Sequence, residues 1–245
     1  MSLRRGGVAT MLLAVAWLAG CSHLPGKPPP GPEVPRPDSV LDPVVLFNQN
    51  CSGCHGADGK SGPAMMLSDP VYLAIVDDDT LRATISKGRP GTAMSAFAQK
   101  EGGMLTDEQV NAIVRGIRKR WSKPNALGGD VAPPYAAKIP GDPSRGQAVY
   151  SSYCASCHGD SGAGGPKAGS VVDKSYLTLI TDQGLRTIVI TGRPDFNAPD
   201  WRNNIAGHPM TDQEITDVVA WLASQRPNRA AGISAAASMS PGGAH

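Results

Sequence analysis

The residues best able to do chemistry lie in a pentapeptide that occurs twice. The pattern is Cys-x-x-Cys-His, and its fixed residues are Cys51, Cys54 and His55 in the first copy and Cys154, Cys157 and His158 in the second. Two cysteines on one turn can form thioethers with the two vinyl groups of a haem, and the histidine that follows is placed to bind the iron. The sequence therefore predicts two covalently bound haem c groups.

Other uses of a Cys-x-x-Cys pair need surroundings that this sequence lacks. A thioredoxin-like redox pair needs a βαβ context, and a zinc site needs a second pair of ligands close by. The remaining cysteine is Cys21, close to the N-terminus. No thiol is left for a structural disulfide, which favours haem attachment.

The N-terminus has the features of an export signal. Arg4 and Arg5 precede an apolar run over residues 8–19, which closes on Leu-Ala-Gly-Cys21. A helix that crosses a bilayer needs about 20 apolar residues, so the run is too short for a permanent span. Leu-Ala-Gly-Cys resembles a bacterial lipobox, which implies cleavage after a signal peptide of residues 1–20 and lipidation of Cys21. The alternative is an ordinary secreted protein that is cleaved elsewhere.

Segments rich in Pro and Gly divide the rest of the chain. We predict a Pro-rich stalk over residues 21–42, a Pro/Gly-rich linker over 126–143 and a disordered tail over 229–245. Two domains remain, at 43–125 and 144–228. Both are short, but a covalently held haem can serve as much of a core.

The two domains repeat one another at a nearly constant offset. The matched residues are Tyr72 and Tyr176, Leu81 and Leu185, Arg82 and Arg186, and the Gly-Arg-Pro tripeptides that begin at Gly88 and Gly192. Thr106 and Thr211 each precede acidic or amide residues and then apolar residues at helical spacing, which is typical of a helix N-terminus. Each domain is predicted to have a short helix before the pentapeptide, a middle helix and a final amphipathic helix.

This order of elements resembles the class I cytochrome c domain, and the resemblance covers residues 43–123 and 144–227. It implies an all-α fold of two tandem domains and haem attachment outside the cytoplasm, in agreement with the export signal. The family has an aromatic residue on the first helix, matched by Phe47 and Tyr150, and another on the last helix, matched by Trp221. The equivalent residue in the first copy is Gly116, so we expect a weaker helix contact there.

The resemblance also implies how the iron is held. His55 and His158 would be the proximal ligands, and the carbonyl groups of Pro63 and Pro166 would accept the other ring hydrogen. A class I domain has a Met ligand after the middle helix, and Met94 fits closely. The alternatives in the first copy are coordination by Met104, Met65 or Met66, or an open site.

The second copy departs from this pattern, because Ala198 stands at the position of Met94. Met210 is the default ligand, although it aligns with Leu105, where an apolar residue often packs before a helix cap. His208 and an open site are the alternatives. Arg89 and Arg193 either pair with haem propionates or are solvated.

The function that these features predict is electron transfer and not catalysis. We expect a membrane-anchored dihaem cytochrome that passes single electrons between transient or complex-bound respiratory partners, in the periplasm or at the outer face of a cell membrane. The formal net charge of +2 gives no indication of nucleic-acid binding. The rivals are a haem enzyme, such as a dihaem peroxidase with an open second haem, and a fixed cytochrome subunit of a dehydrogenase or respiratory complex.

Overall fold

The computed structural model describes residue 31 and residues 34–227. The predicted signal peptide, the predicted lipidation site Cys21 and the predicted tail lie outside the described residues. The chain divides into two units, Met1–Ser39 and Val40–His245. In the first unit, residues Pro37–Ser39 form the short 3-10 helix η2.

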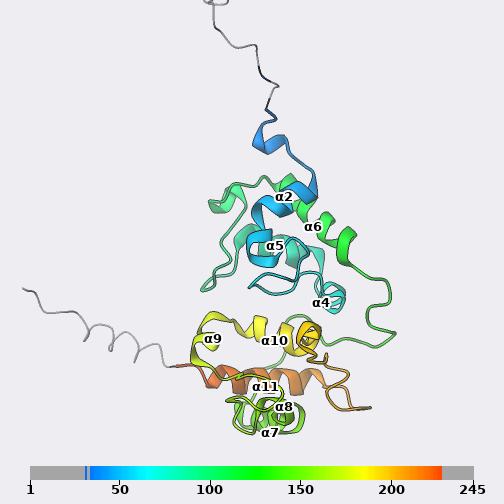
Figure 1. The fold of residues 1–245 in the computed structure, drawn as a ribbon, viewed down its shortest axis with the longest axis vertical. Coiled ribbons are helices and arrows are strands. Elements are labelled where there is room, and N and C mark those ends of the chain that lie inside the picture. The colour runs from blue at the N-terminus through cyan, green and yellow to red at the C-terminus, as the bar shows by residue number, and fades with distance from the viewer. Residues whose placement is uncertain (1–30, 32–33, 228–245) are drawn as a thin grey trace, which may run out of the picture. The chain divides into compact units, whose positions relative to one another are not determined.

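The second unit holds both repeats, and each consists of helices in the same order (Figure 1). The first repeat contains α2 (Pro43–Asn50), α3 (Ser52–His55), α4 (Pro70–Ile75), α5 (Asp78–Lys87), η3 (Gln99–Glu101) and α6 (Asp107–Trp121). The second contains α7 (Pro143–Tyr153), α8 (Ala155–His158), α9 (Lys174–Leu179), α10 (Asp182–Thr191), η4 (Pro194–Phe196) and α11 (Asp212–Ser224). Extended pairing among the described residues is limited to two isolated bridges, so the predicted all-α fold is confirmed. No helix in the described part of the chain is long and apolar enough to span a membrane.

The final helices begin where the sequence predicts. The hydroxyl of Thr106 accepts from the Gln109 amide, and the Gln109 side chain accepts in turn from the Thr106 amide. Thr211 and Glu214 form the same reciprocal capping box at α11. Each box satisfies two amide groups that have no partner inside the helix.

The predicted middle helix is two helices in each repeat. The chain is extended at Val76, and the Asp77 carboxylate then accepts from the Thr80 amide at 2.6 Å, so α5 starts afresh. In the second repeat, Ile180 is extended and Thr181 caps α10. A capping side chain can therefore divide an apolar stretch that helical spacing alone would join.

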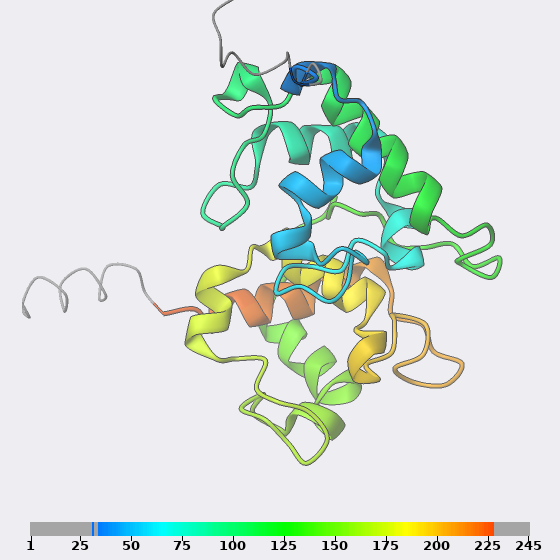
Figure 2. The ribbon, with the colours of Figure 1, turned by 45° about the horizontal axis from the view of Figure 1, so that its top comes forward.

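The first and last helices of each repeat cross at one close contact, α2 with α6 and α7 with α11 (Figure 2). In the first repeat the small residue is Gly116 on α6, where a methyl group would lie 2.5 Å from the side chain of Pro43. In the second repeat the small residue is Gly146 on α7, and its methyl group would lie 2.8 Å from the Cβ of Trp221. At this crossing the glycine lies on the last helix in the first repeat and on the first helix in the second repeat.

The contact between the first and last helices is less extensive in the first repeat than in the second, as Gly116 predicts, yet it includes an aromatic pair. Trp121, five residues after Gly116 on α6, lies edge-on to Phe47 with ring centroids 5.1 Å apart. In the second repeat, Trp221 stacks on Tyr150 at 4.3 Å. The same contact between helices is made from two different positions along the last helix.

The cores of the two repeats interlock. Val71 of α4 is buried in the core of the second repeat, and Ile75 packs against that core as well. Tyr135 of the linker packs against the core of the first repeat. The two repeats are therefore joined by packing as well as by the chain.

Candidate functional site

The two attachment pentapeptides have nearly the same backbone geometry. Cys51 ends α2 and precedes α3 with φ −121° and ψ −33°, and Cys154 has φ −121° and ψ −30° between α7 and α8. All four cysteines of the pentapeptides are free thiols. Burial, followed by the neighbouring thiol, raises the pKa of Cys51 and of Cys154 to about 11. The thiols of each pentapeptide are unpaired, on one turn, in the arrangement that two thioethers to one haem need.

A backbone carbonyl fixes the ring of each motif histidine, but it is not the predicted proline carbonyl. Nδ1 of His55 lies 2.8 Å from the carbonyl oxygen of Met65, and Nδ1 of His158 lies 2.7 Å from that of Gly169. These two residues are equivalent in the repeats. The contacts expected of Pro63 and Pro166 are replaced because each loop folds back onto the pentapeptide further along the chain.

The fold-back is made by another equivalent pair of residues. The amide of Ala64 donates to the carbonyl of Cys54, and that of Ala168 donates to the carbonyl of Cys157. The carbonyl group of the following residue, Met65 or Gly169, then faces the histidine ring. Donation from Nδ1 leaves Nε2 free to bind a metal, which is the tautomer that a haem iron requires. The residues present therefore fit a covalently attached haem in both repeats.

Met94 lies in a six-residue loop that follows α5. The Arg89 amide donates to the Met94 carbonyl at 2.8 Å and closes the loop, and the Met94 amide donates to the Thr92 hydroxyl at 3.2 Å. The Met94 side chain is half-buried against the core of the first repeat. Met104, a second methionine that could in principle bind the first iron, is 80% exposed.

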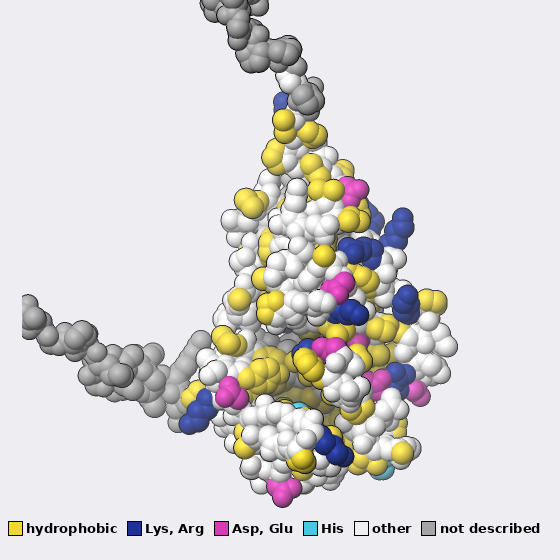
Figure 3. Space-filling view, viewed as in Figure 1, with side chains coloured by type: hydrophobic (Ala, Val, Ile, Leu, Met, Phe, Trp, Pro, Cys, Tyr) yellow, Lys and Arg dark blue, Asp and Glu magenta, His cyan; other side chains and the backbone are white. Residues whose placement is uncertain are grey.

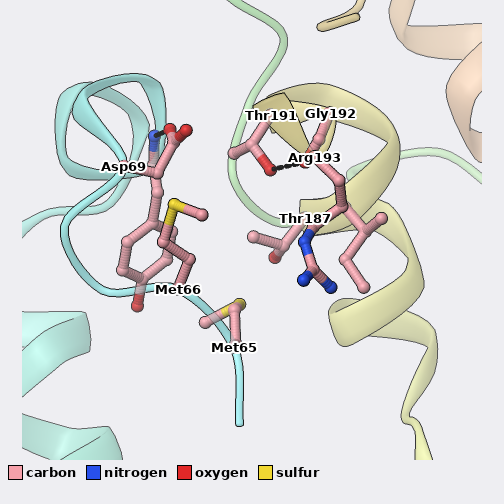
Figure 4. A pocket seen from close by; sticks show the side chains of 9 residues that line it. Met65, Met66, Asp69, Thr187, Thr191, Gly192 and Arg193 are labelled. Carbon is pink, nitrogen blue, oxygen red and sulfur yellow. Dashed lines mark hydrogen bonds between the residues drawn. The ribbon is translucent and has the colours of Figure 1, made fainter. Parts of the chain in front are cut away.

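Met65 and Met66 line a small cavity between the repeats (Figure 4). The two methionines lie on one side of it, and Thr187, Thr191 and Arg193, from α10 and the residues after it, lie on the other. Met65 thus contributes its carbonyl group to the first histidine and its side chain to the junction of the repeats.

The loop after α10 has the length of the Met94 loop but carries no methionine. The Arg193 amide donates to the Ala198 carbonyl at 3.0 Å, as the Arg89 amide donates to Met94. Met210 instead matches Leu105, because its amide donates to Trp201 as the Leu105 amide donates to Phe97, the residue equivalent to Trp201. Met210 is 3% exposed, within the core of the second repeat.

His208 is exposed and belongs to a polar cluster. Its Nδ1 lies 3.3 Å from the Tyr153 hydroxyl, which also donates to the Glu214 carboxylate at 3.1 Å. Burial tends to raise the pKa of Glu214, but the Thr211 amide and hydroxyl, Tyr153 and the charge of His208 outweigh this, and the pKa is lowered.

The arginines of the two Gly-Arg-Pro tripeptides have protein partners. Arg193 forms two hydrogen bonds to Asp195, at 2.9 and 2.7 Å, and Arg89 donates to the Tyr135 hydroxyl at 2.5 Å. Neither is simply solvated. The role of Tyr135 was not predicted, because no motif marks this linker residue.

The surfaces of the final helices differ in charge. Exposed Arg115 and Lys119 lie on α6, and Lys123 follows it. None of the three forms an ion pair with another described residue. Figure 3 shows Lys and Arg side chains gathered on the side of α6. Positions 115 and 119 correspond to Ala220 and Ser224 on α11, so this basic stripe belongs to the first repeat alone.

Comparison with known proteins points to one family. The family model described as cytochrome C oxidase, cbb3-type, subunit III matches residues 38–115 and again residues 141–222. The chain is 32% identical to the cbb3-type cytochrome c oxidase subunit CcoP of Azospirillum sp. (strain B510), over 50% of this chain and 40% of that protein. It is 25% identical to subunit FixP of Bradyrhizobium diazoefficiens, over 66% of this chain and 54% of that protein.

A shorter relative and one solved structure are also similar to this chain. Cytochrome c55X of Stutzerimonas stutzeri is 33% identical over 35% of this chain and 70% of that protein. A chain of the reducing HAO-like protein complex of Kuenenia stuttgartiensis matches 79% of this chain and 100% of its own length, with a TM-score of 0.47 and 16% identity. The chain spans about half the length of the CcoP and FixP subunits that it matches.

Proposed function

Because this chain belongs to the family described as subunit III of cbb3-type cytochrome c oxidase, we propose that it is a membrane-anchored electron-transfer subunit of a respiratory complex. The chain is a tandem c-type cytochrome with two covalently bound haem c groups. The observation that carries the proposal is the repetition of the whole attachment geometry. In both repeats a backbone carbonyl group orients the histidine, and the two cysteines of the same pentapeptide are free thiols.

The first haem site has a complete set of side chains for an electron carrier. In this proposal Cys51 and Cys54 would form the thioethers, and His55 and Met94 would bind the iron. When bound, the haem supplies a couple between Fe(III) and Fe(II) that takes up one electron. A thioether ligand favours Fe(II) and occupies the position that a substrate would need. The protein residues hold the ring orientation through the Met65 carbonyl and the loop closure at Arg89.

The relatives favour a fixed subunit over a free shuttle. The names of CcoP and FixP describe them as subunits of an oxidase, and we propose that this chain likewise has complex-bound partners. In this proposal lipidated Cys21 holds the chain at the outer face of a membrane or in the periplasm, and the Pro-rich stalk gives the haem repeats their reach.

Spectroscopy of the purified protein tests the cofactor and its ligand. We expect a haem assay to give two haems per chain, and the oxidised protein to show a charge-transfer band from methionine to iron. Met94→Ala should abolish the band, whereas replacing the exposed Met104 by Ala should leave it unchanged. Fewer than two haems per chain, or a band whose intensity is unchanged in Met94→Ala, contradicts the assignment.

Fractionation of cells tests the anchor. Cys21→Ser should release the cytochrome from the membrane fraction while its haem content stays at two per chain. If the variant is retained as fully as the wild type, lipidation of Cys21 does not hold the protein on the membrane.

The basic stripe of the first repeat supports an acidic electron-transfer partner, because opposite charges speed association. Arg115→Glu with Lys119→Glu should slow reduction by an acidic flavodoxin at low salt by about tenfold or more. Lys167→Glu with Lys174→Glu changes the net charge equally, at exposed lysines of the second repeat. If both pairs of substitutions slow reduction by the flavodoxin equally, the net charge of the protein sets the association rate and the basic stripe is not the docking surface. Reduction by a neutral flavin measures the intrinsic rate.

A further inference from the structure

The second repeat lacks the methionine that we propose as a ligand of the first haem iron. The loops Arg89–Met94 and Arg193–Ala198 have the same length and are closed by the same hydrogen bond, at 2.8 and 3.0 Å. Ala198 therefore occupies the backbone position of Met94. It lacks the Cγ, Sδ and Cε atoms, and its methyl group offers no lone pair to a metal.

Met210 does not take the place of the missing side chain. Its backbone forms the hydrogen bond of Leu105, and both residues are buried directly before the threonine cap of the last helix. The Met210 sulfur lies 3.9 Å from Nδ2 of Asn204, which makes it a weak hydrogen-bond acceptor within the protein. Because Leu105 fills the same place with no lone pair to give, the position serves packing in both repeats.

His208 is also engaged elsewhere. Its ring is exposed and contacts Tyr153, with ring centroids 6.4 Å apart, and Nδ1 meets the Tyr153 hydroxyl. That hydroxyl is held by Glu214, which belongs to the capping box of α11. A shift of the His208 ring toward a buried iron would give up the hydrogen bond to Tyr153 and the exposure of the ring.

We propose that the iron held by His158 has no side-chain ligand on its distal side and that this site binds a small uncharged diatomic ligand. The proposal rests on the proposed function, since it needs the second haem in place. The loop that ends at Ala198 is closed by the same hydrogen bond as the loop that ends at Met94. The space available to a ligand is therefore the volume of the Cγ, Sδ and Cε atoms that Ala198 lacks. Trp201, three residues after Ala198, belongs with Ile190 and Met210 to the apolar core of the second repeat, and apolar surroundings disfavour a charged ligand.

Carbon monoxide is the probe, used with the reduced, haem-loaded full chain. We expect one carbon monoxide per chain, which is half of the haem, and a high-spin signal from half of the ferric iron. Ala198→Met restores the side chain of the first repeat, so it should abolish binding and add a second methionine-to-iron band. Met94→Ala should raise the stoichiometry to two. Met210→Leu, which copies Leu105, and His208→Gln should leave it at one.

Different results would overturn the inference. If the native protein binds no carbon monoxide and Met210→Leu creates a binding site, Met210 is the ligand, and the same result with His208→Gln assigns His208. Binding that persists in Ala198→Met shows that the missing side chain does not control access. The haem content is measured before any ligand is added, and fewer than two haems per chain refutes the proposed function itself.

Discussion

Arg186 and Arg82 are equivalent residues of the two repeats, yet their surroundings predict very different contributions to stability. The side chain of Arg186 is 3% exposed and that of Arg82 is 38% exposed. Arg186 donates to the carbonyl groups of Pro134 and Tyr135, to the Thr216 hydroxyl at 2.9 Å and to the Asp212 carboxylate. It therefore ties the linker to α10 and α11.

The contacts of Arg82 are fewer and more open to water. It donates to the side chain of Asn111 at 2.9 Å and pairs with Asp79, whose side chain is 97% exposed. Removing one partner of a buried ion pair costs about 3–5 kcal/mol, whereas exposed pairs contribute about 0–1 kcal/mol. Asp212 is 29% exposed and regains some solvation, so we expect the low end, about 3 kcal/mol, for Arg186→Ala.

Thermal unfolding of the two alanine variants measures this difference. A free-energy change of 1 kcal/mol shifts the Tm of a chain of this size by about 2–4 °C. Arg186→Ala should thus lower Tm by about 6–12 °C and Arg82→Ala by less than about 4 °C. Far-ultraviolet circular dichroism of the oxidised, haem-loaded protein reports the transition. Equal falls in Tm would refute the reasoning that burial and contact with the linker set the contribution of this arginine.

The structure supports two further tests. Gly146→Ala would place a methyl group 2.0 Å from the Asp217 carbonyl oxygen, so Tm should fall by several degrees, whereas Gly53→Ala, with no atom within 4 Å, should leave it unchanged. Asp217 is buried, which raises its pKa, but Arg145, the Asp142 amide and Gln213 outweigh burial and lower it. We therefore expect the free energy of unfolding of the wild type to exceed that of Asp217→Asn by about 1–3 kcal/mol above pH ~4. This difference should vanish as the pH falls through the lowered pKa of Asp217 in the folded protein. Guanidinium unfolding from pH 6 to pH 3 measures it, and a pH-independent gap contradicts it.

Local patterns in the sequence predicted the parts of the structure that depend on neighbouring residues. The threonine caps at Thr106 and Thr211 and the turn that presents Cys51, Cys54 and His55 are of this kind. The division of the middle helix at Asp77 was missed because the apolar spacing continues across it and only the carboxylate cap reveals the break.

Contacts between distant parts of the chain were beyond such patterns. The sequence did not indicate that Trp121 would replace the aromatic missing at Gly116, because a helix can present a ring to the same neighbour from adjacent turns. The choice of the Met65 carbonyl over that of Pro63 depends on where the loop folds back, which is a hydrogen bond to Cys54. The linker contact of Arg186 likewise joins residues about fifty positions apart.

The packing of Val71 and Ile75 against the core of the second repeat has a kinetic consequence for two attached haems. Their separation is set by side-chain packing, and not by the length or stiffness of the linker. In the haem-loaded protein, exchange of an electron between them would be an internal, first-order step whose rate does not vary with protein concentration. Added viscosity slows the encounter with a partner but leaves this internal step unchanged. The interlocked core would then let the two attached haems act as one electron store with two places to hold charge.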